Sequence, residues 1–359
     1  MKTTINIVAP GRICLFGDHQ DYLGLPVIAC AINKQVLLSS EENETSKFYI
    51  NMPDIGTERI IPIEETFEVL EVGDHLASVL RVLRRYGCIP NKGYDIELKS
   101  TIPINAGISS SSAIVVVWTH FLLQTFGCDH EVTPSLVAQL AYEAEVVEHN
   151  SPGGKMDQFT ISLGDIIYID TNRNFSYKTI GTQLNGLILG ESGVPKETIG
   201  LLGELRGKAQ EAIAQLKKTN PKFSLRSVTM DEVSTLSEYI SEELQPYFYA
   251  AIKNHSITRQ AVLEFEKEQP DPIAIGQLMN EHHSVLKNIL RITVPQIDIM
   301  IDAAMEAGAY GTKIVGSGGG GSIVALAPSH KTEKVIVAIK ASGAKDAYQV
   351  SVVKGTQMI

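Results

Sequence analysis

The sequence predicts a two-domain protein with an α+β fold. The chain has 359 residues, enough for two domains or one large one with a sizeable core. Short β-branched segments dominate its first half, helical periodicity dominates after residue 196, and strand-like segments return near the C-terminus. Runs of strands followed by runs of helices are typical of α+β folds or of separate domains.

In the first half, β-branched or apolar runs between turn signals predict strands. These runs lie at residues 5–9, 27–39, 48–52, 94–98, 165–170 and 186–190. Apolar residues at helical spacing predict a helix over residues 75–86. The first half is therefore expected to be rich in strands.

After residue 196 the apolar spacing changes to that of helices. We expect helices at 198–216, 231–240, 244–268 and 271–290, and strands at 313–315, 322–326 and 348–353. This change in the spacing of apolar residues predicts a domain boundary near residue 185. The predicted domains are residues 1–185 and 186–359.

Composition excludes several classes of protein. The 31 Lys and Arg against 41 Asp and Glu give a net charge of −10, which argues against a nucleic-acid partner. The N-terminal MKTTINIVAP has no apolar core for a signal peptide, and no run approaches the ~20 apolar residues of a membrane span. Four scattered cysteines with apolar neighbours and no CxxC pair predict reduced thiols rather than a zinc site. We therefore expect a cytoplasmic protein.

Residues 103–113, PINAGISSSSA, combine small residues with four consecutive serines at the expected start of a helix. Small residues let the backbone close around a phosphate, and the N–H groups and dipole of a helix N-terminus attract an anion. The alternative interpretation is a helix N-cap with surplus serines. Because four serines exceed what a cap needs, we favour phosphate binding. The Val115-Val116-Val117 run that follows would also suit a strand.

Residues 313–322, KIVGSGGGGS, contain GxGxxG at Gly316, Gly318 and Gly321. A dinucleotide-binding fingerprint should open a helix, but residues 322–326 are strand-like, which argues against that site. A glycine-rich turn between strands suits a backbone packed against ligand or protein, or a simple tight hairpin. Five glycines within six residues are costly to order, which favours a functional need.

Two further segments gather polar side chains. Residues 17–22, GDHQDY, follow Arg12 and offer carboxylates and an imidazole that suit polyol hydroxyls, although a solvated polar loop fits equally well. In residues 145–159, EVVEHNSPGGKMDQF, Asp157 lies between Met156 and Phe159. A carboxylate in apolar surroundings is a candidate base or metal ligand; a surface aspartate after a capped helix is an equal alternative.

These segments, in this order, resemble the GHMP kinases over essentially the whole chain. Residues 9–22 are similar to the galactokinase signature GRxNLIGEHxDY, and residues 103–113 to the family's phosphate loop PxGxGLSSSA. Residues 152–159 are similar to the galactokinase PCGxMDQF, and residues 311–322 to the family's C-terminal glycine motif. Residues 279–286 resemble a galactokinase helix that begins MNxSHxSL. The absence of GxxxxGK[ST] and of HRD and DFG motifs excludes a P-loop ATPase and a protein kinase.

The resemblance implies an ATP-dependent kinase that phosphorylates a sugar at its anomeric hydroxyl. Its fold would be an N-terminal domain like ribosomal protein S5 domain 2 and a ferredoxin-like C-terminal domain, with the active site between them. Asp157 would be the catalytic base, and Arg12 would lie near the transferred phosphoryl group. Ser111 and Glu145 would bind the Mg²⁺ that accompanies ATP, with Ser112 left open because the serine run has one extra member.

The resemblance also implies binding residues for both substrates. The sugar contacts would be Asp18, His19, Asp21 and Gly154. The ATP contacts would be Asn105, Ala106, Gly107, Ile108, Ser109, Ser110, Ser111, Ser112, Gly318 and Gly319. The expected partners are thus ATP and a small-molecule sugar, with no nucleic acid and no membrane, and the protein would be a monomer or small homo-oligomer.

Three departures weaken the assignment of the sugar. The family's Glu becomes Asp18, its usual Asn becomes Cys14, and the Tyr-Arg segment of galactokinases is replaced by residues 191–206, which are more similar to mevalonate kinase. Galactose is the leading acceptor, and mevalonate, a uronic acid or another C6-modified sugar are alternatives. The Asp21-Tyr22 pair favours a sugar over mevalonate. A non-catalytic sugar sensor and, remotely, a dinucleotide-binding oxidoreductase are the rivals of another class.

Overall fold

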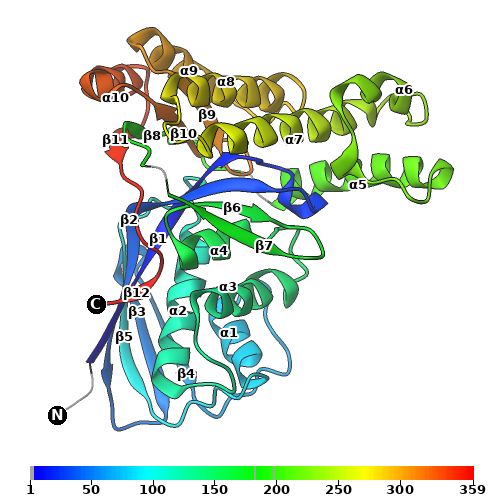
Figure 1. Ribbon diagram of the computed structural model, residues 1–359. Coiled ribbons are helices and arrows are strands. Elements are labelled where there is room, and N and C mark those ends of the chain that lie inside the picture. The colour runs from blue at the N-terminus through cyan, green and yellow to red at the C-terminus, as the bar shows by residue number, and fades with distance from the viewer. Residues whose placement is uncertain (1–3, 182, 197–198) are drawn as a thin grey trace.

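A computed structural model describes residues 4–181, 183–196 and 199–359 (Figure 1). The described chain forms an eight-stranded sheet with helices packed on it, and a separate four-stranded sheet covered by further helices. These two sheets confirm the α+β fold. Within the described residues, no helix is both long and apolar enough to cross a membrane.

The large sheet has the strand order β12-β1-β2-β5-β3-β4, and β6 joins β2 and β7 outside this path. Only β3 and β5 pair in parallel; the other pairings are antiparallel. Its strands are β1 (Thr4–Phe16), β2 (Val27–Glu42), β3 (Lys47–Met52), β4 (Thr57–Pro62), β5 (Tyr94–Ser100), β6 (Ile166–Asp170), β7 (Ser176–Ile180) and β12 (Gln357–Met358). The sequence did not predict β4, β7 or β12.

Strand β1 is much longer than the predicted 5–9. Pro10-Gly11 suggested a turn, but the register with β2 shifts between these two residues and pairing resumes at Gly11. Such an irregularity bends a strand without ending it. The consequence is functional, because Arg12 lies within a buried strand and not in a loop.

Four helices pack beside the large sheet: α1 (His75–Arg84), α2 (Ser110–Phe126), α3 (Pro134–Tyr142) and α4 (Met156–Leu163). Helix α2 is the central one, with contacts to β1, β2 and the other three. Its Trp118 is fully buried, packs edge-on against Phe48 at 5.2 Å between ring centroids, and donates a hydrogen bond to the Leu76 carbonyl. The valine run is therefore helical, and its length and burial resolve the ambiguity.

The smaller sheet is antiparallel with the order β11-β8-β10-β9. Its strands are β8 (Leu187–Glu191), β9 (Gly311–Val315), β10 (Ser322–Leu326) and β11 (Asp346–Val350). Helices α9 (Pro295–Ala307) and α10 (Thr332–Ala341), which the sequence did not predict, pack on it. The glycine-rich segment is thus the turn between β9 and β10, which confirms that it does not open a helix.

The remaining helices are α5 (Ile199–Thr219), α6 (Val233–Ser237), α7 (Gln245–Phe265) and α8 (Pro272–Asn288). The prediction of one helix over 231–240 was wrong in extent, because a capping box at Thr229 and Glu232 starts a short 3₁₀ turn and α6 spans only five residues. Thr198, the first residue of the predicted 198–216 helix, lies outside the described residues. Helix α8 packs on β9, and α7 packs on α8 and β1.

The chain passes from the large sheet to the small one between β7 and β8, close to the predicted division at residue 185. The last segment then returns to the large sheet. Val352 bridges to Ile32, Lys354 bridges to Gly164, and β12 pairs with β1 (Figure 1). Two segments therefore connect the sheets, one before β8 and one after β11.

Candidate active site

Arg12 and Asp157 form the centre of the site. Arg12, which is 5% exposed, donates from Nε to Asp157 Oδ1 at 2.7 Å and from Nη2 to Oδ2 at 2.9 Å. Its third nitrogen, Nη1, donates to the Gly107 carbonyl at 2.6 Å, which fixes the serine loop against β1. A bidentate pair of this kind sets both the position and the orientation of the carboxylate. The pairing of two residues 145 positions apart is the strongest support for the predicted catalytic set.

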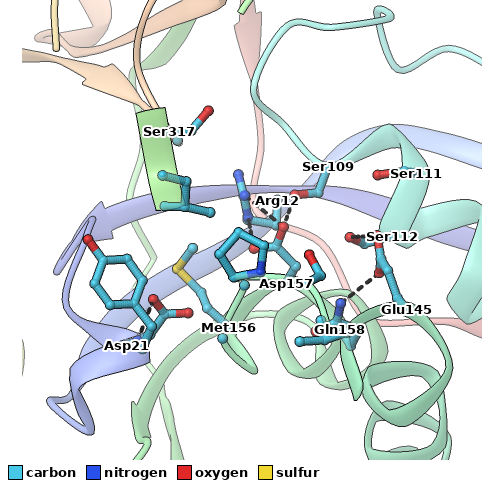
Figure 2. A pocket seen from close by; sticks show the side chains of 18 of the residues that line it. Arg12, Asp21, Ser109, Ser111, Ser112, Glu145, Met156, Asp157, Gln158 and Ser317 are labelled. Atoms are coloured by element: carbon cyan, nitrogen blue, oxygen red, sulfur yellow. Dashed lines mark hydrogen bonds and ion pairs between the residues drawn. The ribbon is translucent and has the colours of Figure 1, made fainter. Parts of the chain in front are cut away.

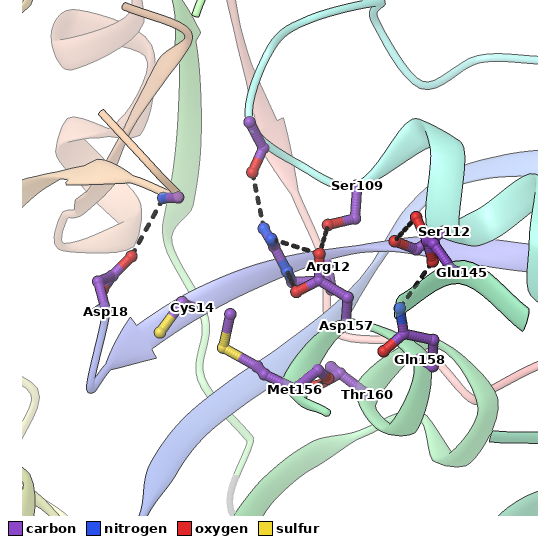
Figure 3. A network of polar contacts seen from close by, with 12 residues as sticks. Arg12, Cys14, Asp18, Ser109, Ser112, Glu145, Met156, Asp157, Gln158 and Thr160 are labelled. Atoms are coloured by element: carbon purple, nitrogen blue, oxygen red, sulfur yellow. Dashed lines mark hydrogen bonds and ion pairs between the residues drawn. The ribbon is translucent and has the colours of Figure 1, made fainter. Parts of the chain in front are cut away.

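Asp157 is held as an anion. Burial acts to raise its pKa, but the charge of Arg12 and hydrogen bonds from Arg12 and Ser109 outweigh burial and hold the pKa below its ordinary value. The Ser109 hydroxyl donates to Asp157 Oδ2 at 2.5 Å. Ser109 lies at the N-cap of α2 with φ of 62°, yet its side chain makes no capping bond. The simple N-cap interpretation therefore fails for this serine, whose side chain turns toward Asp157 (Figure 3).

A second cluster lies one turn further along α2. The Ser112 hydroxyl donates to Glu145 Oε1 at 2.9 Å, and Gln158 Nε2 donates to Oε2 at 2.6 Å. Glu145 lies on a π-helical segment, Glu143–Val147, that follows α3; single π turns recur at functional sites. Burial, partly opposed by the Gln158 hydrogen bond and reinforced by the Asp157 charge, raises the pKa of Glu145 to about 7. A carboxylate this reluctant to ionise alone gains most from a cation beside it.

On the other side of Asp157, Asp21 faces the Gly-Gly turn that precedes α4 (Figure 2). A Cβ added to Gly154 would come within 1.9 Å of Asp21 Oδ2, so any other residue there would displace the carboxylate. Burial and the nearby Asp157 charge raise the pKa of Asp21 to about 6. Asp21 Oδ1 accepts from the Tyr22 backbone, and no side-chain cation pairs with this carboxylate among the described residues.

Unlike Asp21, Asp18 is paired with a buried lysine. Its Oδ2 pairs with Lys313 Nζ at 2.7 Å, and its Oδ1 accepts the Gly316 backbone N–H at 3.1 Å. Lys313 is completely buried and also donates to the Cys14 carbonyl. Burial raises the pKa of Asp18, but the Lys313 charge overcomes this and lowers it below the ordinary value. Both oxygens of Asp18 are thus engaged by β9 and the glycine turn.

His19 follows Asp18 in the sugar-loop candidate (residues 17–22), and its backbone adopts the left-handed conformation with φ of 62°. Its Nδ1 lies 3.2 Å from the Tyr22 hydroxyl, and its buried Nε2 has no hydrogen-bond partner in the described chain. Burial, more than any charge, lowers the pKa of His19, so the ring is neutral at pH 7. A neutral imidazole donates or accepts a hydrogen bond according to its tautomer.

These residues surround one cavity of about 170 Å³. It brings together the predicted Arg12, Asp18, His19, Asp21, Ser109, Ser111, Ser112, Glu145, Gly154 and Asp157, along with Tyr22, Lys196, Leu202 and Ser317. It joins the start of α2, the sugar-loop candidate 17–22, the turn before α4 and the β9–β10 turn. Residues from both sheets therefore contribute to one site.

The other predicted ATP contacts do not line this cavity. Ser110 lines a neighbouring apolar cavity, and Asn105 and Ala106 line a small polar one. The glycine turn packs against protein: the Gly319 N–H donates to the Ile292 carbonyl at 2.7 Å, and Gly318 also abuts Ile292. The carbonyl of Ile108 accepts from the Arg12 backbone, and Gly107 abuts Val315. ATP contacts at these positions remain predictions.

Sequence reasoning missed Lys313 and Lys196. Lys313 could have been noticed as a charge inside an apolar strand that precedes five glycines. Lys196 carried a weaker signal, a lone cation soon after a buried strand. Gln158 was quoted only as part of the MDQF match, although its amide holds Glu145.

Comparison with known proteins agrees with this geometry. The chain matches the GHMP kinases N-terminal domain over residues 74–165, the GHMP kinases C-terminal domain over 260–345 and the galactokinase galactose-binding signature over 2–39. A galactokinase of Thermococcus kodakarensis is 28% identical over 92% of this chain and 91% of its own. A mevalonate kinase of Thermococcus sibiricus is 27% identical over 93% and 92%. The crystal structure of Lactococcus lactis galactokinase complexed with galactose superposes with a TM-score of 0.88 at 21% identity, covering 99% of this chain and 95% of that one.

The chain belongs to the GHMP kinases, and the fold expected from its motifs is confirmed. Within the family it is galactokinase-like, because the galactose-binding signature covers β1, the 17–22 loop and most of β2. It is therefore a phosphotransferase that acts on a small molecule.

Proposed function

We propose that this kinase transfers the γ-phosphoryl group of ATP to the anomeric hydroxyl of a neutral hexose, with galactose the leading candidate. The observation that carries the proposal is the charge of the cavity. Among the described residues, four carboxylates line it, Asp18, Asp21, Glu145 and Asp157, against two cations, Arg12 and Lys196. Lys313 balances Asp18 from behind, and Arg12 balances Asp157.

The acceptor half of the cavity is made by six residues: Asp18, His19, Asp21, Tyr22, Gly154 and Leu202. Among the described lining residues this half holds an unpaired carboxylate and no cation. Arg206 of α5 acts on the pKa of Tyr22, but it does not line the cavity. A carboxylate on the acceptor would be repelled by Asp21, whereas a hydroxyl would donate to it. This supports a neutral sugar over a uronic acid or mevalonate.

A second cavity, beside the serine loop, could bind the base of ATP. An apolar cavity of about 350 Å³ lies next to the start of α2 and shares Ser110 with that loop. Its apolar walls are Val36, Met52, Ile55, Leu98, Ile102, Ile104 and Ile114. Such a pocket suits a flat base, and a nucleotide seated there would direct its phosphates toward the N-terminus of α2.

Asp157 would accept the hydrogen bond of the attacking hydroxyl and take its proton as the phosphoryl group transfers. Its low pKa means that it orients the nucleophile more than it deprotonates it beforehand, which suits phosphoryl transfer, where positioning and electrostatics dominate. Arg12 would keep Asp157 in place and offset charge on the transferred group. The backbone of the serine loop would hold the phosphates.

Mg²⁺ fits the second cluster. Mg²⁺ in phosphoryl-transfer enzymes is commonly held by one or two carboxylates together with substrate phosphates. Glu145 supplies the carboxylate, and Ser112, with Ser111 beside it, supplies a hydroxyl. No group of three or more His, Cys, Asp or Glu in the described chain forms a metal cage, so phosphates would complete the set. When bound, Mg²⁺ would offset negative charge on the phosphates.

Mevalonate is the second candidate, because a mevalonate kinase matches this chain as extensively as a galactokinase does. An ADP-release assay with neutral hexoses, uronic acids and mevalonate separates the candidates, with Asp157→Asn as the blank for contaminating kinases. We expect a neutral hexose, galactose first, to turn over and the anionic acceptors to be poor. Turnover of mevalonate with no activity on any sugar would overturn the choice of acceptor and leave the kinase assignment intact.

A further inference from the structure

Lys196 is a half-buried cation that the roles described above leave unused. It follows β8 and lines the active-site cavity with Arg12, Asp157 and Ser111. Within the described chain it has no hydrogen-bond or ion-pair partner, whereas Arg12 and Lys313 each hold a carboxylate. An unpaired cation inside a cavity is unfavourable unless an anion arrives there.

The electrostatics around Lys196 support this interpretation. Burial and then the positive charge of Arg12 lower its pKa, and the carboxylates of Asp157 and Glu145 oppose this only in part. Each of the three side-chain nitrogens of Arg12 already donates one hydrogen bond, to Asp157 or to the Gly107 carbonyl. The cavity therefore has one positive charge that its own carboxylates leave free for a ligand.

The glycine turn between β9 and β10 fixes the segment that precedes Lys196. The Ser192 hydroxyl donates to the Gly321 carbonyl at 2.7 Å, and the Gly321 N–H donates to the Val194 carbonyl at 2.9 Å. Gly320 has φ of 137°, and a Cβ there would lie 2.6 Å from the Val194 carbonyl oxygen and 2.8 Å from that of Pro195. Close approach of backbone to backbone requires glycine. The turn thus fixes residues 192–195, which lead directly into Lys196.

We propose that Lys196 binds the γ-phosphoryl group of ATP and that the glycine turn acts by positioning it. This rests on the proposed use of ATP as donor. In the transfer, the acceptor oxygen forms a bond to the γ-phosphorus while the bond to the β–γ bridging oxygen breaks and ADP leaves with the electron pair. The acceptor proton passes to Asp157, and Lys196 stays protonated throughout.

The test compares two nucleotides. Isothermal titration with Mg²⁺ present measures the binding of ADP and of the non-hydrolysable analogue AMPPNP to the wild type, Lys196→Ala and Lys196→Arg. Because a charge-assisted contact would exist only with the third phosphate, Lys196→Ala should weaken AMPPNP binding by about tenfold or more and leave ADP within about twofold. Lys196→Arg should retain most of the difference. Lys208→Ala, a surface change on α5, should alter neither.

ADP binding also reports whether the variant is folded. Equal weakening of both nucleotides, or no weakening of either, would overturn the role of Lys196. Activity gives a second measurement: kcat of Lys196→Ala should fall by about 10²-fold or more, while KM for the sugar stays near the wild-type value. If the wild type phosphorylates no acceptor in the panel, the proposed sugar fails, but the nucleotide comparison still decides on Lys196.

Discussion

The two halves of the cavity hold their carboxylates in opposite ways. The half to which we assign phosphoryl transfer, here called the phosphoryl-transfer half, holds Asp157 and Glu145. Asp157 is bound by Arg12 and Ser109, and Glu145 by Ser112 and Gln158. In the acceptor half, Asp21 has only backbone partners among the residues that the structure describes, and Asp18 is bound by a lysine that comes from the other sheet (Figures 2 and 3).

This difference suggests that one half of the cavity performs the reaction and the other selects the substrate. In the phosphoryl-transfer half, both oxygens of each carboxylate accept side-chain hydrogen bonds, and these bonds fix the positions of Asp157 and Glu145. A carboxylate with free acceptor capacity is available to a substrate hydroxyl, and buried polar groups left unpaired in the absence of the right ligand give strong discrimination. Asp18, although it belongs to the sugar signature, behaves in this structure as a link between the two sheets.

The largest expected effect is on Asp157. Asp157→Asn should lower kcat by about 10²–10⁴-fold, the usual contribution of a general base, while nucleotide binding survives. Steady-state kinetics and ADP titration measure the two quantities. A fall in kcat of less than about tenfold would mean that Asp157 is not the base.

A matched control exists outside the cavity. Asp170 forms the same kind of two-pronged pair with Arg226, whose two terminal nitrogens donate to its two oxygens at 2.8 and 2.6 Å. Asp170→Asn should leave kcat near the wild-type value. A large kcat loss in both variants would indicate that breaking any such ion pair distorts the enzyme.

The next effect is on stability. Asp18→Ala would leave Lys313 buried without a counter-charge, and loss of one partner of a buried pair costs about 3–5 kcal/mol. Thermal unfolding should show a large drop in Tm, partly restored in Asp18→Ala with Lys313→Met, where neither charge remains. Asp165→Ala, which breaks an exposed pair with Lys354, should stay within about 1 kcal/mol. A wild-type Tm for Asp18→Ala would refute the linking role.

For Asp21 we expect a loss of sugar binding and little change in stability. Asp21→Ala should lower kcat/KM for the sugar by about tenfold or more, because a sugar hydroxyl loses its acceptor, and leave KM for ATP unchanged. The wild-type kcat/KM should also fall as the pH drops through about 6, since the raised pKa means that Asp21 becomes protonated there and loses acceptor capacity. A wild-type profile that is flat from pH 8 to 5 would argue against an ionised Asp21 in sugar binding.

The smallest expected effect concerns magnesium. Ser112→Ala and Glu145→Ala should each raise the Mg²⁺ concentration for half-maximal activity several-fold, as removal of a ligand or its partner weakens the site. Ser111→Ala is the matched comparison, since Ser111 is exposed and Ser112 is buried against Glu145. A response in Ser111→Ala alone would identify Ser111 as the ligand, as the sequence predicted, and no response in any variant would reject the metal assignment.

Much of the phosphoryl-transfer half could be predicted from sequence. Its residues lie in compact motifs whose spacing is visible, such as the serine run and MDQF. The choice between Ser111 and Ser112 could not be made, because neighbours on a helix point about 100° apart and only the packing of α2 decides which one faces Glu145. The extension of β1 through Arg12 was hidden because Pro10-Gly11 has the composition of a turn but forms a strand irregularity.

The acceptor half was less predictable, since its key partners are distant in sequence. Asp18 and Lys313 are 295 positions apart, and no local pattern reveals that a lysine in a buried strand reaches the sugar loop. The return of residues 352–358 to the large sheet was missed for the same reason.

The ratio of kcat/KM for galactose to that for galacturonic acid, measured in the wild type and in Asp21→Asn, tests the central claim most directly. The two sugars share the anomeric hydroxyl and differ at C6, and like-charge contact with a carboxylate costs several kcal/mol. A neutral-sugar site with a free Asp21 predicts a wild-type ratio of about tenfold or more and a smaller ratio in Asp21→Asn. A wild-type ratio at or below one would contradict the account and direct attention to Arg206 as the partner of an anionic sugar.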